Sequence, residues 1–185
     1  LMSAALNVAR REWGWIKANP LSDVRKPSNP PPRDRRVSPQ EIEKLLLAAG
    51  SDLSKVSARV VHAFRFAIET GMRAGEIVGL DWSKIDYDAR VAGLEMTKNG
   101  MAREVPLTTA AVELLRMLGQ SGATCFQLNS GQVDAMFRKM RDKAGIENLK
   151  FHDSRHEAIT RLAKKLDVLS LARMVGHRDI KMLQI

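Results

Sequence analysis

The sequence predicts a mainly α-helical (α+β) domain that carries one small three-stranded antiparallel sheet. Apolar residues recur at helical spacing both before and after residues 82–107. Within that stretch, short runs separated by turn residues replace the helical period, and Asn99-Gly100 is a strong hairpin signal. Hydrophobic residues make up 44% of the 185 residues, which is enough to bury a sizeable core.

The individual elements follow from these periods and from local start and stop signals. Ser38-Pro39-Gln40-Glu41 combines an N-cap serine, a proline at the first helical position and a glutamate at the third. Residues 56–70 are apolar on nearly every side, which indicates a buried central helix that Gly71 ends. The predicted helices cover residues 3–17, 39–49, 56–70, 73–79, 109–118, 131–143, 153–166, 168–175 and 179–185, and the predicted strands cover 83–86, 90–96 and 103–106.

Proline marks a boundary between two parts of the chain. Residues 20–32 combine several prolines with polar and basic residues, a composition typical of an extended connector. We therefore expect a linker over residues 20–37, with the main domain over residues 38–185. Residues 1–19 are interpreted as the end of a domain whose remainder is missing.

The net charge is +9, because thirty lysines and arginines face twenty-one aspartates and glutamates. Such an excess in a foldable domain favours a polyanionic partner, with nucleic acid ahead of a membrane surface. A single cysteine, Cys125, excludes an internal disulfide framework and a cysteine-based zinc site. The apolar runs are too short to cross a membrane, and no signal pattern opens the chain, so it is interpreted as cytoplasmic.

Arg73, at a predicted helix break, is the first candidate site residue. It follows Gly71, and Glu76 lies three residues further on, on the same helix face. The carboxylate could hold the guanidinium fork outward for a bidentate contact with phosphate. Taken alone, the pattern is more typical of a surface ion pair.

The start of the helix predicted at residue 153 holds a second candidate. Arg155 shares a helix face with apolar residues such as Ile159 and Leu162. An arginine on an apolar face is unusual unless it is paired or bound to a ligand. The N-terminus of a helix also favours an anion, and His152 lies beside it.

Two further basic residues lie at turns. Lys98, at the predicted hairpin tip, could donate a proton to a leaving oxygen if the tip reached into a cleft, although such lysines are normally solvated. His177 follows Gly176 between two predicted helices, where a lone histidine is usually structural. The four histidines lack metal-ligand spacing and no Gly-rich phosphate loop is present, so we expect neither a metal nor a cofactor.

In this order, the candidate residues resemble the tyrosine recombinase family, also called phage integrases. The family pattern is an arginine after a Thr-Gly-x turn, a lysine on a β-hairpin, His-x-x-Arg, Leu-Gly-His, and a tyrosine nine residues past that last histidine. The resemblance covers about residues 38–185, and residues 3–17 resemble the last helix of the family's core-binding domain. The matching residues are Arg73 with Glu76 as its acidic support, Lys98, His152, Arg155 and His177.

The chain departs from the family pattern at three positions. Ser154 stands where the family usually has leucine, and Val175 replaces the leucine of Leu-Gly-His; both are packing positions. Nine residues past His177 is position 186, so the nucleophilic tyrosine is expected immediately after Ile185, and the catalytic domain is interpreted as truncated just before it. Tyr87, the one tyrosine of the chain, is interpreted as structural.

The resemblance implies site-specific DNA recombination by strand breakage and rejoining through a 3′-phosphotyrosine, with no metal or cofactor. It implies that Arg73, Arg155 and His177 stabilise charge on the scissile phosphate. His152 would be the base for the tyrosine proton, and Lys98 the acid for the leaving 5′-oxygen. The expected partners are double-stranded DNA and further copies of the chain in a homotetramer on DNA. The outcome could be integration, excision, inversion or resolution.

Two other functions remain open from the sequence. A catalytically inactive DNA-binding accessory protein of the same fold would be distinguished by the residue at position 186 and by a cleavage assay. A helical transcriptional regulator with a winged motif would explain the charge and the hairpin. It would not explain Arg155 on an apolar face or the order of the basic residues.

Overall fold

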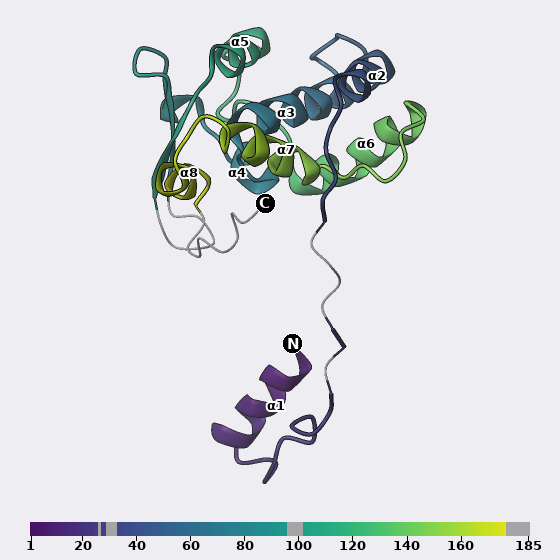
Figure 1. Ribbon diagram of the computed structural model, residues 1–185, viewed down its shortest axis with the longest axis vertical. Helices are drawn as coiled ribbons and strands as arrows, with labels where there is room; N and C mark the ends of the chain where they lie inside the picture. Colours follow the sequence, from purple (N-terminus) through teal and green to yellow (C-terminus); the bar gives the residue numbers. More distant parts are fainter. Residues whose placement is uncertain (26, 29–32, 96–101, 177–185) are drawn as a thin grey trace. The chain divides into compact units, whose positions relative to one another are not determined.

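The computed structural model describes residues 1–25, 27–28, 33–95 and 102–176 (Figure 1). The chain divides into two compact units, Leu1–Arg33 and Asp34–Ile185. Lys98, His177 and the predicted helix 179–185 lie outside the described residues. No helix within the described ranges is both long enough and apolar enough to cross a membrane.

The first unit is built on α1 (Met2–Arg11). The prediction of a helix over residues 3–17 was wrong for its last six residues, because the chain turns back after α1. Gly14 adopts a left-handed conformation, with φ +64°. The Asn19 side chain then donates hydrogen bonds to the backbone oxygen of Ser3, at 3.2 Å, and to Oδ1 of Asn7, at 2.9 Å. These bonds hold the returning segment against the helix.

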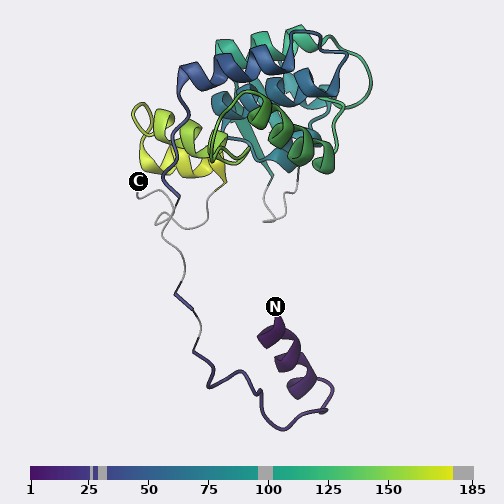
Figure 2. The same cartoon turned by 90° about the vertical axis from the view of Figure 1, so that its right-hand side faces the viewer.

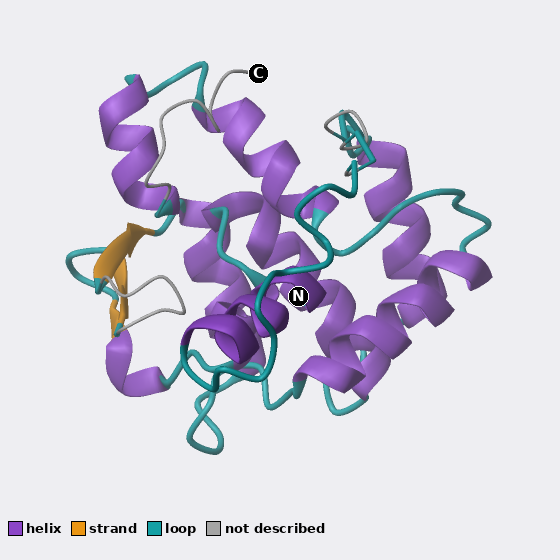
Figure 3. Ribbon diagram, turned by 90° about the horizontal axis from the view of Figure 1, so that it is seen from below, coloured by secondary structure: helices purple, strands orange, loops and turns teal. Residues whose placement is uncertain are grey.

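The second unit is mainly helical and carries a three-stranded antiparallel sheet of order β1-β2-β3, which confirms the predicted fold class. Its register pairs Ala92 of β2 with Ile85 on one side and with Val105 on the other. The strands lie at one edge of the helices (Figure 3). The elements are α2 (Pro39–Ala49), α3 (Val56–Thr70), α4 (Ala74–Val78), a short 3₁₀ helix (Trp82–Lys84), β1 (Ile85–Asp86), β2 (Val91–Leu94), β3 (Arg103–Pro106), α5 (Thr109–Leu118), α6 (Ser130–Lys143), α7 (Asp153–Leu162) and α8 (Val168–Val175).

Several predicted boundaries in this unit were wrong. Residues 83–84 belong to the 3₁₀ helix and not to the first strand. The second strand begins one residue late, because Arg90 has a left-handed φ of +54°. The helix predicted over 153–166 ends at Leu162, and the Asp167 side chain then caps α8 by accepting from the backbone N–H groups of Leu169 and Ser170, both at 3.0 Å.

Helix α3 is the centre of the core, as its all-round apolar pattern predicted. Ten of its fifteen residues are buried, and it packs against α2, α5, α6 and α7 (Figure 1). Phe64 of α3 packs against the tilted ring of Phe137 of α6, with ring centroids 4.7 Å apart, and meets Phe151 edge-on at 5.6 Å. This cluster fixes the backbone immediately before His152 and the start of α7.

The start of α2 has the predicted capping box. The Ser38 hydroxyl accepts from the backbone N–H of Glu41 at 3.2 Å, and the Glu41 carboxylate accepts from that of Ser38 at 2.9 Å. Because these two bonds satisfy donors that the helix leaves free, the helix start is fixed locally.

Buried Glu157 joins the segment before α2 to α7. Its carboxylate accepts from Nε of Arg36 at 2.7 Å, from the backbone N–H of Val37 at 3.1 Å and from Nε of Arg161 at 2.7 Å. Burial opposes the charge, but the donors outweigh it, so the pKa of Glu157 falls to about 2. Since Arg155 lies two residues earlier, this contact steadies the helix that carries it. Figure 2 shows α7 and α8 side by side on one flank of the unit.

Glu157→Gln tests this contact through pH. The folded-state pKa of about 2 lies below the ordinary 4.5, so the stabilisation is complete above pH 4.5 and is lost as the pH falls toward 2. We expect the variant to be less stable by about 2 to 3 kcal/mol at pH 7, with the gap closing below pH 4.5 in urea unfolding. A gap independent of pH would contradict the assignment. Glu43→Gln, on the exposed side of α2, is the control and should show no such gap.

Candidate active site

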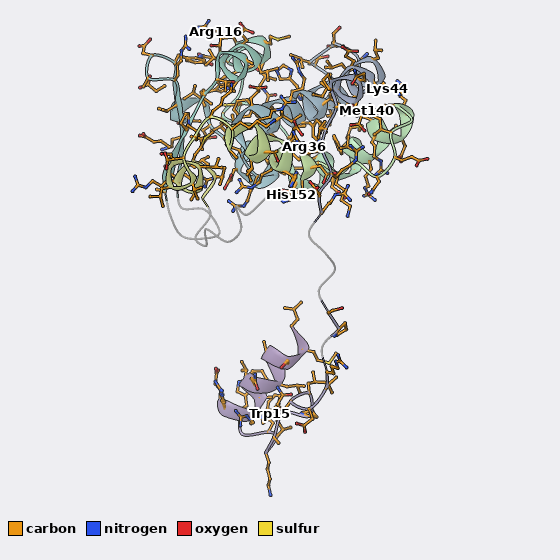
Figure 4. The ribbon with its side chains drawn as sticks, viewed as in Figure 1. Trp15, Arg36, Lys44, Arg116, Met140 and His152 are labelled. Atoms are coloured by element: carbon orange, nitrogen blue, oxygen red, sulfur yellow. The ribbon has the colours of Figure 1, made fainter. Side chains whose placement is uncertain are left out.

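Three of the predicted site residues line one cavity of about 390 Å³. Arg73 immediately precedes α4, while His152 immediately precedes α7 and Arg155 lies in its first turn. Figure 4 labels His152 at the lower margin of the unit. Apolar and basic side chains both line the cavity; its other lining residues are Met72, Ala74, Ser130, Val133, Asp134, Phe137, Arg138, Arg141, Leu149, Lys150, Phe151 and Ser154.

Glu76 holds Arg73 by both its backbone and its side chain. The carboxylate accepts from the Arg73 backbone N–H at 2.8 Å and from Nη1 at 3.0 Å. The break at Gly71, with φ +66°, places Arg73 at the start of α4. The Arg73 side chain stays about one-third exposed, at 32%, so its remaining donors can reach a ligand in the cavity.

Arg103 is a residue of this site that sequence reasoning did not select. Its Nη2 donates to the second carboxylate oxygen of Glu76 at 2.9 Å, and its side chain is only 10% exposed. Burial of Glu76 opposes its charge, but the hydrogen bonds from Arg103 and from the Arg73 backbone keep its pKa below the ordinary value. The available signal was the period of two in β3, which places Arg103 on the same face as buried Val105.

Arg155 is buried, with only 3% of its surface exposed. It donates to the backbone oxygen of Gly71 and, at 2.6 Å, to that of Val175. Burial, and then the nearby Arg73 charge, lower the pKa of Arg155 to about 10, so it remains protonated at pH 7. The apolar face of α7 therefore accommodates this arginine because backbone carbonyl groups satisfy it.

Three arginines converge on the C-terminal end of α8. Arg103 Nε donates to the backbone oxygen of Met174 at 3.0 Å, Arg155 donates to that of Val175, and Arg73 makes a longer contact of 3.4 Å with that of Gly176. The last carbonyl groups of a helix lack intrahelical donors and carry partial negative charge. The helix end is therefore a natural receptor for guanidinium groups.

His152 lines the cavity beside these charges. Desolvation first, and then the nearby Arg155 charge, lower its pKa from the ordinary value. The lowered pKa favours the neutral imidazole, which is the form that can accept a proton.

Lys98 and His177 are not placed, since both lie outside the described residues. In sequence, Lys98 lies between the described strands β2 and β3, and His177 directly follows the described residue Gly176. Their roles stay predictions.

The chain belongs to the phage integrase family, whose model matches residues 35–185. It is 42% identical over 183 residues to a putative integrase/recombinase of Haemophilus influenzae, covering 96% of this chain and 60% of that protein. It is 37% identical over 187 residues to the shufflon-specific DNA recombinase of Escherichia coli, covering 100% of this chain and 48% of that protein. The chain thus spans about half the length of these relatives.

The fold is also that of a solved recombinase structure. A lambda integrase dimer bound to a COC′ core site, comprising residues 75–356 of that protein, superposes with a TM-score of 0.78 at 24% identity, covering 98% of this chain and 70% of that one. At this identity the likeness shows the fold alone.

Gly176→Ala tests the close approach of Arg103 to the end of α8. A Cβ there would lie 3.1 Å from the guanidinium carbon of Arg103, on a backbone with φ +66°. Gly145 is the matched control, because it has φ +64° but open space around a Cβ. Each alanine variant should have a free energy of unfolding lower by about 1 kcal/mol, because alanine disfavours the left-handed backbone conformation. The crowding at Gly176 should add about 1 kcal/mol or more in urea unfolding; equal losses would contradict the close contact.

Proposed function

We propose that the chain is the DNA-cleaving part of a tyrosine recombinase that acts at specific DNA sites. The observation that carries this proposal is the placement of two arginines, Arg73 and Arg155, at one cavity in a member of the phage integrase family. Both guanidinium groups are held by protein acceptors. Fixed guanidinium forks beside an anion are the preorganised electrostatic element that phosphoryl transfer requires.

In this reaction a tyrosine oxygen attacks a DNA phosphorus, forming a P–O(tyrosine) bond while the bond to the 5′-oxygen breaks. Arg73 and Arg155 stabilise the charge on the non-bridging oxygens, with His177 as a further donor. Neutral His152 takes the tyrosine proton, and Lys98 supplies a proton to the leaving 5′-oxygen. A 5′-hydroxyl from another strand then attacks the phosphotyrosine, which forms a new phosphodiester and releases the tyrosine. Because one phosphate ester replaces another at each step, the reaction requires no external energy source.

The nucleophile is assigned to position 186, nine residues past His177. Tyr87 is unsuited to this role because it packs beside α5, where the guanidinium of Arg116 lies 5.8 Å from its ring centre. It is also absent from the lining of the cavity. The 185 residues by themselves would therefore bind DNA without cleaving it.

The partners that we propose are double-stranded DNA and further copies of the protein, acting as a tetramer in the cytoplasm. The net charge of +9 supports a grip on backbone phosphates that is independent of base sequence. Lys150, Arg138 and Arg141 line the same cavity as Arg73 and Arg155 and add to its positive charge, although Arg138 and Arg141 are paired with Asp134 and Asp142.

Substituting either arginine in the full-length protein tests this function. Arg73→Ala and Arg155→Ala should each lower covalent capture of a nicked duplex carrying its recombination site by about 10²-fold or more, since each removes a donor to the transition state. Duplex binding, measured by gel shift, should change little. Arg90→Ala, in the exposed turn between β1 and β2, is the control. Cleavage at the normal rate by either site variant would exclude the assignment.

The 185-residue chain itself provides a second test. It should bind duplex DNA with an affinity that falls by roughly 10³-fold or more between 50 and 200 mM salt, provided that about six phosphates are contacted. It should form no covalent adduct with a nicked site under denaturing electrophoresis. An adduct would mean that a nucleophile lies within these residues, which would remove position 186 from the mechanism.

A further inference from the structure

Arg103 links three elements, β3, α4 and α8, whose relative positions matter for the proposed reaction. It lies at the first position of β3, the strand that leaves the predicted hairpin of Lys98. Its Nη2 donates to Glu76 of α4 at 2.9 Å, and its Nε donates to the backbone oxygen of Met174 in α8 at 3.0 Å. The partners are 27 and 71 residues away in sequence, so one side chain fixes a long-range arrangement.

We propose that Arg103 is a positioning residue for recombination, which orients Arg73 through Glu76 and fixes the end of α8 through the Met174 carbonyl. This inference rests on the proposed function. Arg103 does not line the cavity that holds Arg73 and Arg155, and it acts through the groups that it holds.

The contact of Arg103 with Glu76 determines how the two carboxylate oxygens are divided between Arg73 and Arg103. One oxygen, Oε1, accepts from the Arg73 guanidinium, while the other, Oε2, accepts from the Arg73 backbone and from Arg103. Without Arg103, Oε2 loses its charged donor, and the carboxylate is free to turn toward the Arg73 side chain. The Arg73 guanidinium would then be drawn from the cavity toward Glu76.

The contact with Met174 determines where α8 ends. The next two carbonyl groups, of Val175 and Gly176, accept from Arg155 and Arg73. Arg103 thus fixes the first of three successive acceptors, and a shift there moves the other two. His177, the next residue, follows directly from this helix end.

The geometry requires arginine and a neighbouring glycine. Nε and Nη2 point to different acceptors, and the single nitrogen of a lysine cannot donate to both with the same planar spacing. The guanidinium also lies against Gly176, where any Cβ would come within 3.1 Å of it. Glycine at position 176 therefore allows the planar guanidinium of Arg103 to lie close against the backbone.

The experiment compares Arg103→Gln and Arg103→Lys in the full-length protein. We expect Arg103→Gln to lower the single-turnover cleavage rate at saturating protein by about 10- to 100-fold, because small misplacements of a catalytic group have effects of this size. Duplex affinity should stay near that of the unaltered protein, whereas the thermal midpoint should fall by several degrees, because the buried Glu76 carboxylate loses a charged donor. Arg103→Lys should recover part of the rate, since it keeps a charged donor to Glu76. Arg90→Gln, at an exposed arginine in the turn between β1 and β2, is the matched control.

A double-mutant cycle with Glu76→Gln tests the route through the carboxylate. If Arg103 acts through Glu76, the double variant should cleave about as slowly as the slower single variant. Independent effects, whose rate losses multiply, would overturn that route. Cleavage by Arg103→Gln at the normal rate, or a loss that follows duplex affinity alone, would overturn the positioning role.

Two controls keep the outcomes separate. If Arg103→Gln does not fold, Arg103→Lys decides: slow cleavage with an unchanged thermal midpoint supports the proposal, and normal cleavage overturns it. The unaltered protein must first give a covalent complex with the nicked site. Its failure to do so would contradict the proposed function, whereas normal cleavage by a folded Arg103 variant would contradict only the role of Arg103.

Discussion

The candidate site depends on the capping of the C-terminal end of α8 by arginines from three other elements. Successive carbonyl groups of Met174, Val175 and Gly176 accept from Arg103, Arg155 and Arg73. Because a helix end leaves its last carbonyl groups without intrahelical donors, it both attracts and orients cations. Segments from β3, the start of α7 and the start of α4 are thereby held at one point.

This arrangement leaves an excess of positive charge beside the cavity. Among the described residues beside the end of α8, the Glu76 carboxylate forms ion pairs with Arg73 and Arg103. Arg155 donates instead to neutral backbone carbonyl groups. Like charges in a partly buried space repel one another, so an anion brought into the cavity would relieve that repulsion. A phosphodiester has the charge and the oxygen geometry to do so.

The rest of the unit supplies a rigid frame for that point. The contact of Phe151 with Phe64 fixes the chain just before His152, and the buried carboxylate of Glu157 ties α7 to the segment before α2. Arg155 lies between these two supports on the same short helix. Its position is therefore set from both sides before any ligand is present.

The sequence determined the features that depend on neighbouring residues. The helical period of residues 56–70, the Ser38–Glu41 capping box and the three-residue spacing of Arg73 and Glu76 are local, and each appears in the structure as the pattern indicated. An arginine on an apolar face also marked Arg155 as unusual. The early end of α1 was missed, because the Asn19 side chain that holds the returning segment against the helix is not visible as a helix period.

Only the tertiary structure decided which groups those residues meet. Arg155 finds its acceptors at Gly71 and Val175, and the role of Arg103 became visible only when β3, α4 and α8 were placed together. The physical reason is distance along the chain: these hydrogen bonds join residues 20 to 84 positions apart. Periodicity and capping act over a few residues, whereas the charge balance of the site depends on carbonyl groups that any sequence would supply.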